Sequence, residues 1–224
     1  LHLVPGNYFV IGGRPSAGKT ALSLQFAAGM AKQGKRVCYF SLETDPATLQ
    51  ARLIANQLYA PLSAVKNKTL SINELDRLAD MKRWPLYIRS AAGKGVAWIK
   101  AQALRMKADI IFVDYLQLIH ERGSSDRYNA ITEISIALHE LAQTTGILVV
   151  ALAQLNRNAA RAEPSNADLR ESGQIEQDAD AILLLSADCD TYFSRLTKNK
   201  EGRVGNAGLE FDKMTQHFTC GTAN

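Results

Sequence analysis

A glycine-rich octapeptide, GRPSAGKT at residues 13–20, limits the folds that are open to this chain. It follows an apolar run, Tyr8–Gly12, and precedes a stretch in which apolar residues recur at helical spacing as far as Met30. A glycine turn between a strand and a helix points successive backbone N–H groups at one place, and the helix adds the positive end of its dipole. The segment therefore predicts a P-loop that binds phosphate. A turn that matches the motif by chance is the alternative, and the strand–turn–helix context argues against it.

The residue types of this turn also predict which parts of a nucleotide they contact. In such loops the lysine, here Lys19, reaches the β- and γ-phosphates, and the hydroxyl of the next residue, Thr20, binds Mg²⁺. We therefore expect a nucleoside triphosphate with Mg²⁺. The predicted nucleotide-binding residues are Gly13, Arg14, Pro15, Ser16, Ala17, Gly18, Lys19, Thr20 and Ala21.

Apolar runs bounded by turn or capping residues alternate with helical patterns along most of the chain, which favours a parallel sheet with crossover helices. Most of these runs are too continuously apolar for a sheet with one wet face, so helices should cover both faces. With 46% hydrophobic residues among 224, one globular domain of class α/β is expected. The predicted strands are Tyr8–Gly12, Arg36–Leu42, Leu86–Arg89, Asp109–Asp114, Ile147–Ala153 and Ala181–Leu185.

The last part of the chain has a different pattern, in which short apolar segments are separated by glycines and polar turns. It predicts an antiparallel edge to the sheet. Two helix starts are also recognisable: Asp45 before Pro46 reads as an N-cap, and Ser71 to Glu74 as a capping box. The predicted antiparallel strands are Tyr192–Thr197, Ala207–Phe211 and Gln216–Thr219.

Charge and composition narrow the class of protein. Twenty-six basic residues against 22 acidic ones give a net charge of +4, which leans toward a polyanionic partner without proving one. The three cysteines are too few and too far apart for a disulfide framework, and the four histidines show no metal-ligand spacing. No apolar run approaches the roughly 18 residues of a membrane span. A cytoplasmic protein without a membrane partner is the expectation.

Three polar side chains stand where predicted strands end, at the edge where α/β sheets bind ligands. Asp114 closes an apolar strand and fits an acid that holds Mg²⁺ through water. Glu43 follows another strand and could be the general base for the attacking water, or could simply favour the helix start at Asp45. Gln154 could sense the γ-phosphate or make an ordinary strand-end hydrogen bond.

These segments occur in order with one further stretch, and together they resemble the motifs of the DnaB family. They are GRPSAGKT, Ser41-Leu-Glu43, Asp114-Tyr-Leu-Gln-Leu118, Gln154-Leu-Asn-Arg157 and the specific stretch from Asp168 to Asp178. The resemblance implies a RecA-like P-loop NTPase, the C-terminal motor domain of a bacterial or phage replicative helicase, with a mostly parallel twisted sheet flanked by helices. It also implies an ATP-hydrolysing homo-hexamer that moves on single-stranded DNA.

The same resemblance implies a domain organisation and further partners. Residues 1–224 would form a single RecA-like ATPase domain, and we expect the family's N-terminal helical domain to be absent from this chain. Primase and a helicase loader are the partners that it implies for the full-length protein.

Roles for individual residues follow from the resemblance as well. It makes Glu43 the catalytic glutamate and Gln154 the residue that couples the state of the γ-phosphate to the DNA-binding loops. It places Arg170, Glu171 and Gly173 in a loop that contacts the DNA backbone, as a sequence-tolerant motor needs. For Arg170 and Glu171 a local ion pair is the alternative. The polar segment 120–127 is either a second channel loop or a solvated one.

One departure from the family pattern concerns the residues that a neighbouring subunit inserts beside the γ-phosphate. The family has Lys-x-Arg there, and this chain has Lys198-Asn-Lys200, followed by Arg203. A lysine supplies a point charge without the bidentate fork of arginine. We expect Lys198 and Lys200 to act as catalytic residues, with Arg203 as a possible substitute. Decoration of an exposed hairpin is the alternative for all of them.

Two functions of different classes remain open from the sequence. The first is an ATP-driven replicative helicase motor. The second is a RecA-like nucleotide-dependent DNA-binding or assembly ATPase that does not unwind duplex DNA. A metabolic P-loop kinase is disfavoured, because it would leave the stretch from Asp168 to Asp178 unexplained.

Overall fold

The computed structural model describes residues 2–120, 127–155, 166, 173–188 and 191–221 of the chain. Within these residues the strands belong to a single sheet, and their order in it is β3-β2-β4-β5-β1-β6-β7-β8-β9. Their bounds are β1 Tyr8–Gly13, β2 Val37–Ser41, β3 Leu86–Ser90, β4 Ile110–Asp114, β5 Leu148–Gln154, β6 Ala181–Asp188, β7 Thr191–Asn199, β8 Gly205–Asp212 and β9 His217–Cys220.

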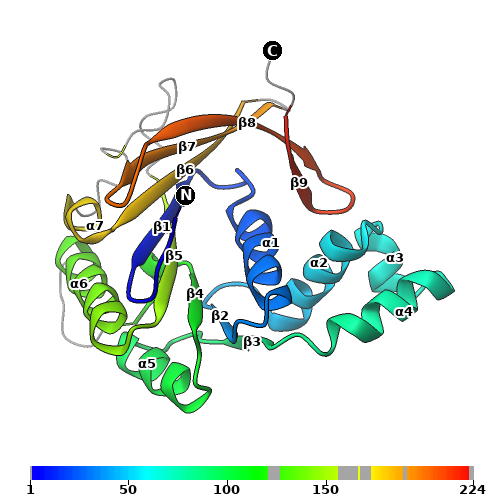
Figure 1. Ribbon diagram of the computed structural model, residues 1–224, viewed down its shortest axis with the longest axis horizontal. Helices are drawn as coiled ribbons and strands as arrows, with labels where there is room; N and C mark the ends of the chain where they lie inside the picture. The colour runs from blue at the N-terminus through cyan, green and yellow to red at the C-terminus, as the bar shows by residue number, and fades with distance from the viewer. Residues whose placement is uncertain (1, 121–126, 156–165, 167–172, 189–190, 222–224) are drawn as a thin grey trace.

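Helices connect the strands, and Figure 1 shows them on both sides of the sheet. The two predicted helix starts are confirmed: the Asp45 carboxylate accepts from the Thr48 N–H at 3.1 Å, and Ser71 and Glu74 form a capping box. The helices are α1 Lys19–Lys32, α2 Pro46–Leu58, α3 Leu62–Asn67, α4 Ile72–Met81, α5 Val96–Arg105, α6 Arg127–Thr145 and α7 Gly173–Asp178, with a short 3-10 turn, η1, at Leu116–Leu118. In the described part of the chain no helix is both long and apolar enough to cross a membrane.

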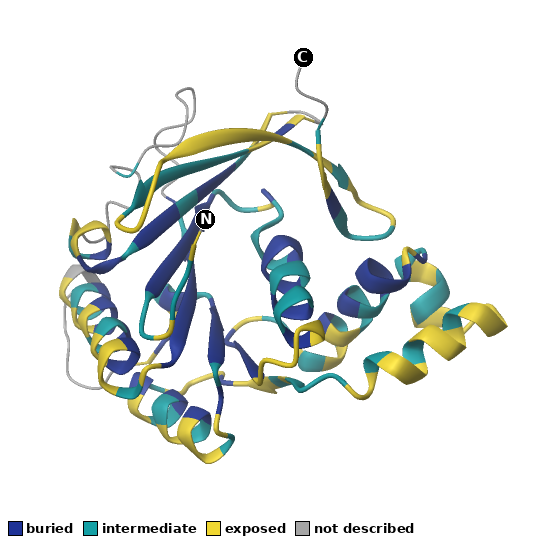
Figure 2. Ribbon diagram, viewed as in Figure 1, coloured by how far each residue is buried: buried dark blue, intermediate teal, exposed yellow. Residues whose placement is uncertain are grey.

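The first six strands are parallel and form the centre of the molecule. Alternate residues of β1 face opposite sides, so that Val10 packs toward α5 and α6 whereas Ile11 packs toward α1 and α2. This double burial explains the continuous apolar runs of the sequence. Figure 2 shows β1, β2, β4 and β5 as buried along their length. The expected α/β fold, with a mostly parallel sheet between two helical layers, is confirmed.

The last three strands form the predicted antiparallel edge. β6 pairs with β7, β7 with β8 and β8 with β9, all antiparallel. In Figure 1 these strands arch over α1, and Figure 2 shows most of β8 as exposed. β9 is bonded to α1 through Phe218. Its backbone C=O accepts from the side-chain amide of Gln25 at 2.8 Å, and its backbone N–H donates to Gln25 Oε1 at 2.9 Å.

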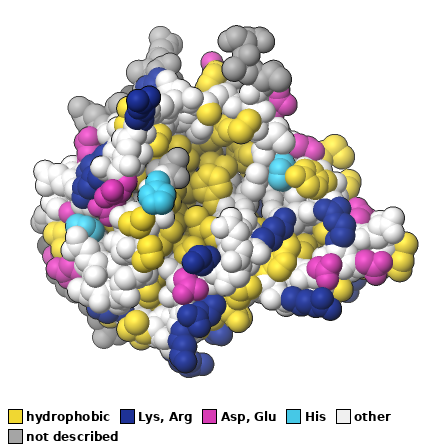
Figure 3. Space-filling model, in the orientation of Figure 1, with side chains coloured by type: hydrophobic (Ala, Val, Ile, Leu, Met, Phe, Trp, Pro, Cys, Tyr) yellow, Lys and Arg dark blue, Asp and Glu magenta, His cyan; other side chains and the backbone are white. Residues whose placement is uncertain are grey.

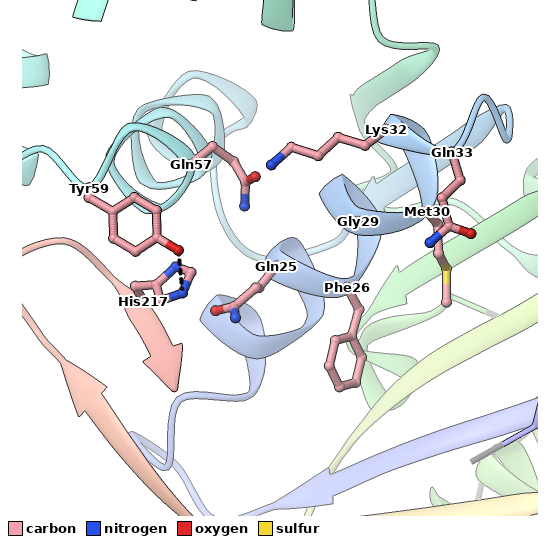
Figure 4. Close-up of a pocket in the computed structure, with 9 residues that line it drawn as sticks. All are labelled: Gln25, Phe26, Gly29, Met30, Lys32, Gln33, Gln57, Tyr59 and His217. Atoms are coloured by element: carbon pink, nitrogen blue, oxygen red, sulfur yellow. Dashed lines mark hydrogen bonds between the residues drawn. The ribbon is translucent and has the colours of Figure 1, made fainter. Parts of the chain in front are cut away.

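A surface groove of about 450 Å³ lies beside α1 and the turn before β9. Figure 4 shows Gln25, Phe26 and Lys32 of α1 on one side of it, and Tyr59 and His217 on the other. In the space-filling view of Figure 3, apolar side chains gather in a hollow at the centre of the same face. The groove residues of α1 are 25–33, so the groove does not include the start of that helix at Lys19.

Candidate functional site

The sheet order brings four strand ends together at one edge. β2, β4, β5 and β1 are consecutive and parallel, so their carboxyl ends point the same way. The register pairs Ser41 with Asp114 and Gly13 with Gln154. The predicted P-loop, acid and sensor residues therefore lie along one edge, where open α/β sheets bind ligands.

The P-loop links β1 to α1 through two left-handed residues, Ser16 with φ 64° and Gly18 with φ 91°. Gly18 is required for a second reason, because a Cβ there would lie 2.7 Å from the ring of Phe218. The Lys19 ammonium folds back across the loop and donates to the backbone oxygens of Gly13 at 2.7 Å and Arg14 at 2.9 Å. The loop thus holds a cation at the residues that the sequence predicts to bind phosphate.

The electrostatics of Lys19 are unusual for a lysine. Burial lowers its pKa to about 8, and the nearby charges of Asp114 and Glu43 partly oppose that shift. A desolvated ammonium that is still protonated at neutral pH gains more from a phosphate partner than a hydrated one does.

Asp114 is the buried acid of the site, with 6% of its surface exposed. Its Oδ2 accepts hydrogen bonds from the Thr20 hydroxyl and from the Tyr39 hydroxyl, each at 2.9 Å. Burial raises the pKa of this carboxyl, whereas the two hydroxyls and Lys19 lower it. The structure therefore brings together Lys19, Thr20 and Asp114 as the sequence predicted.

These groups fit a magnesium ion. A hydroxyl and a carboxylate in mutual contact are hard oxygen ligands of the kind that Mg²⁺ takes from nucleotide-binding proteins. Among the residues that the structure describes, no group of three His, Cys, Asp or Glu side chains could hold a metal by itself. An ion held by Thr20 and Asp114 would therefore complete its coordination with phosphate oxygens and water.

Glu43 lies just beyond β2 on a short turn. The Ser41 hydroxyl donates to the Thr44 oxygen at 2.6 Å and accepts from the Thr44 N–H at 3.1 Å, which fixes this turn, and Glu43 within it is exposed. The backbone N–H of Leu42 also donates to the backbone oxygen of Asp114 at 2.8 Å. The charge of Glu43 raises the pKa of both Lys19 and Asp114, and its role as a base stays a prediction.

Gln154 is held by a residue to which the sequence analysis gave no role. The side-chain amide of Gln117 donates to the backbone oxygen of Gln154 at 2.9 Å. The backbone N–H of Gln154 donates to Gln117 Oε1 at 3.1 Å. Gln117 thus ties the segment after Asp114 to the end of β5. Its position in the Asp114-Tyr-Leu-Gln-Leu118 motif was a signal that could have found it.

Tyr39 is the other residue that the sequence analysis missed. It lies inside the apolar run of β2, where its hydroxyl was the one polar group in the run Val37–Phe40 besides a thiol. A buried tyrosine usually finds a hydrogen-bond partner. That rule predicts a partner but cannot say that it is Asp114, because the register between β2 and β4 is not written in either segment.

Lys198 and Lys200 lie at the opposite end of the sheet from their own P-loop. The backbone N–H of Lys200 donates to the backbone oxygen of Asp180. The backbone N–H of Asp180 in turn donates to the backbone oxygen of Tyr8, at the start of β1. From Tyr8 to Gly13 is five residues, or about 16 Å along a strand. Lys200 therefore lies too far away to reach the P-loop of its own chain.

Both lysines have partners within the chain. The Lys200 ammonium pairs with Asp180 Oδ1 at 2.8 Å, and the Lys198 ammonium donates to the backbone oxygens of Glu176 and Gln177 at the end of α7. Arg203 is exposed in the segment between β7 and β8, and its backbone oxygen accepts from the side-chain amide of Asn199 at 3.0 Å. The ammonium groups of Lys198 and Lys200 are thus both held by residues at or just beyond the end of α7.

The predicted DNA-binding residues are only partly described. Arg170 and Glu171 lie outside the described residues, and so do residues 121–126 of the polar segment 120–127. Gly173 is the exposed first residue of α7. That helix is tied to α6 by the buried Asp178, which accepts from the Ser135 hydroxyl at 2.7 Å.

Comparison with known proteins gives a family match over nearly the whole chain. Residues 2–220 match the DnaB-like helicase C-terminal domain. A probable plasmid replicative DNA helicase of Chlamydia trachomatis is 36% identical over 97% of this chain and 51% of its own length. The replicative DNA helicase DnaB of Treponema pallidum is 36% identical over 94% of this chain and 51% of its length. The chain thus spans about half the length of the curated relatives it matches.

Solved structures match the fold as well. An ATPase domain superposes with a TM-score of 0.89 at 29% identity, covering 96% of this chain and 85% of the other. A DnaB-like replicative helicase, described with its interactions with primase, superposes with a TM-score of 0.87 at 30% identity and covers 96% of this chain and 59% of the other. These matches confirm the RecA-like class of the fold that the sequence predicted.

Proposed function

The chain belongs to the DnaB-like helicase C-terminal domain family, and from that premise we propose that it is the ATP-hydrolysing motor of a replicative DNA helicase. Its substrates would be ATP with Mg²⁺, and single-stranded DNA would be the track. One observation carries the proposal: a P-loop lysine, a hydroxyl and a buried carboxylate meet at one sheet edge, with Lys19, Thr20 and Asp114 in contact or electrostatic range.

Within one subunit the residues divide the work of binding and activation. The P-loop backbone and Lys19 hold the phosphates, and Thr20 and Asp114 hold the ion. When bound, Mg²⁺ supplies positive charge to the β- and γ-phosphate oxygens. Glu43 accepts the proton of the attacking water, since it is a carboxylate on a fixed turn beside the same edge.

The other half of the site would come from a neighbouring copy. Lys200 lies about 16 Å, and Lys198 about 10 Å, from the level of their own P-loop, and we propose that a second subunit faces this part of the antiparallel edge. In a ring, each subunit would then present its lysines to the γ-phosphate of the next. We propose a homo-hexamer on this basis, in which hydrolysis depends on assembly.

Coupling to DNA would run through the segments that follow β4 and β5. Gln117 and Gln154 join these segments at their roots, and Gln154 would report the presence of the γ-phosphate. Arg170, Glu171 and Gly173 would contact the phosphates of the DNA strand without reading its bases. For the full-length protein we propose primase as a partner, in line with the matched helicase structure, and a helicase loader as a second one.

The direct test is ATP hydrolysis by wild-type protein and by Lys19→Ala, each with and without single-stranded DNA. The proposal predicts Mg²⁺-dependent hydrolysis that DNA stimulates, and a loss of about 10²- to 10³-fold in Lys19→Ala, because a positioned cation is removed from the transferring phosphate. Lys82→Ala, on an exposed helix end, is the matched control. An assembled protein whose hydrolysis ignores both DNA and Lys19 would contradict the proposal.

A forked duplex separates this proposal from the alternative of a DNA-binding or assembly ATPase. A motor displaces the paired strand only while ATP is hydrolysed. An assembly ATPase would bind the fork in the presence of ATP and leave it intact. The replicative helicases among the relatives favour the first outcome.

A further inference from the structure

The hydroxyl of Tyr39 lies in the interior of the molecule and contacts the acid of the nucleotide site. Tyr39 is fully buried in β2, and its ring stacks on Phe112 of β4 with centroids 5.6 Å apart. Its hydroxyl lies 2.9 Å from Asp114 Oδ2 and 2.8 Å from the Ser23 hydroxyl of α1. A hydroxyl thus links the P-loop helix, β2 and the metal-binding carboxylate.

Two donors meet the same carboxylate oxygen. Thr20 and Tyr39 both donate to Oδ2 of Asp114, each at 2.9 Å. Within the described part of the chain, no hydrogen bond is made to Oδ1. Two donors on one oxygen fix the plane of the carboxylate, so that Oδ1 is the oxygen left for a metal or its water.

The contact is more than the satisfaction of a buried hydroxyl. Tyr8, in β1, is equally buried, but its hydroxyl lies near Ser135 and the charge of Asp178, and makes no hydrogen bond to Asp114. Burial of a tyrosine in this sheet therefore does not by itself bring its hydroxyl to Asp114. The bonds of Tyr39 are then best explained by what they do for Asp114.

We propose that Tyr39 is a positioning residue for the divalent ion, whose hydroxyl holds Asp114 so that the carboxylate presents Oδ1 to the metal side of the site. The inference rests on the proposed function, because it assumes that Thr20 and Asp114 hold Mg²⁺ with a nucleotide. Tyr39 touches neither nucleotide nor metal and acts through the carboxylate alone.

Removal of the hydroxyl has a defined physical effect. In Tyr39→Phe the ring and its stacking on Phe112 remain, and Asp114 keeps one donor, Thr20, in place of two. A buried charge that loses a hydrogen bond becomes less well satisfied and less well oriented. The gain in nucleotide affinity that Mg²⁺ provides should therefore fall by about tenfold, because a charge-assisted bond is worth roughly that factor.

The experiment measures binding of a fluorescent, nonhydrolysable ATP analogue with Mg²⁺ and with a chelator. The ratio of the two affinities is the magnesium coupling, and it does not depend on turnover. Wild type, Tyr39→Phe and the control Tyr8→Phe are compared, and thermal melting checks that all three are folded. The inference predicts that Tyr39→Phe loses coupling about tenfold with its metal-free affinity unchanged, whereas Tyr8→Phe matches wild type.

Each other outcome overturns the inference. Coupling in Tyr39→Phe that equals wild type means that the hydroxyl does not position Asp114. Equal losses with and without Mg²⁺, or a similar loss in Tyr8→Phe, mean a general packing effect. If wild type itself shows no magnesium coupling, the proposed function fails and the inference falls with it, so that the two failures are distinguishable.

Discussion

The parallel half of the sheet and its antiparallel extension hold their functional side chains in different ways. In the parallel half, Thr20 donates a hydrogen bond to Asp114, and the charge of Asp114 acts on Lys19 at the same edge of the sheet. In the extension, Lys198 and Lys200 bond to the end of α7 and to Asp180, at the far end of β1. The difference teaches that the two groups of residues lie at different ends of the sheet, and on the proposed function the lysines would serve the site of a neighbouring copy.

The sharpest way to break this comparison is to remove a charge from the extension. Lys200→Ala should lower kcat by about 10²-fold and leave KM nearly unchanged, because the lysine is supplied to a nucleotide already held by the neighbour. The Lys200–Asp180 pair has a lysine side chain that is 46% exposed, so its loss should change stability by no more than about 1 kcal/mol. Steady-state kinetics and thermal melting check both points. Equal kinetics in Lys200→Ala and the control Lys82→Ala would mean that the extension takes no part in hydrolysis.

A pH series sharpens the other side of the comparison. Because burial lowers the pKa of Lys19 to about 8, the neutral amine dominates above that pH and the ammonium below it. Affinity for ATP should be greatest below pH 8 and should weaken as the pH rises through 8, by about tenfold for each further unit. Lys19→Arg keeps its charge and should show a flat profile over the same range. An ATP affinity that does not change with pH in wild type would contradict the claim that burial lowers the pKa of Lys19.

A smaller effect is expected at the hydrogen bonds between Gln117 and Gln154, which the proposed function assigns to coupling with DNA. Gln117→Ala removes both hydrogen bonds to the backbone of Gln154, and Gln117→Glu removes only the donor. Stimulation of hydrolysis by single-stranded DNA should fall by about fivefold in the alanine variant, with basal hydrolysis less affected. Gln50→Ala, on the exposed side of α2, is the control. Unchanged stimulation in both Gln117 variants would remove Gln117 from the coupling path.

The smallest effect tests whether lysine is the best cation for the extension. Lys200→Arg restores a bidentate fork and should raise kcat by about threefold. The measurement is turnover at saturating ATP in the assembled protein. A fall in kcat would instead show that the site is shaped around the compact ammonium group.

The sequence predicted the fold closely, because burial on both faces leaves a readable pattern. The strand predicted at Asp109–Asp114 is apolar up to its last carboxylate, and β4 begins one residue later, at Ile110, and ends at Asp114. The antiparallel edge was also predictable, since turn residues separate its short segments. Strand ends moved by a few residues, as at β6, which continues to Asp188 because β7 pairs with it that far.

The candidate site was predictable in part. Residues at the ends of strands, such as Asp114 and Gln154, could be placed because parallel strands end at a common edge. Tyr39 and Gln117 could not, since their contacts depend on the register between strands far apart in the sequence. The partners of Lys200 were missed for the same reason. The roles of Glu43, Arg170 and Glu171 stay predictions.

A mixing experiment tests most directly whether neighbouring copies complete the site. Lys19→Ala lacks the phosphate-binding amine, and the double variant Lys198→Ala/Lys200→Ala lacks the donated charges. Each should be nearly inactive alone. In a one-to-one mixture, about a quarter of the interfaces would join an intact P-loop to an intact hairpin, and hydrolysis should recover toward that fraction of wild type. A mixture that is no more active than its two components would contradict the shared site.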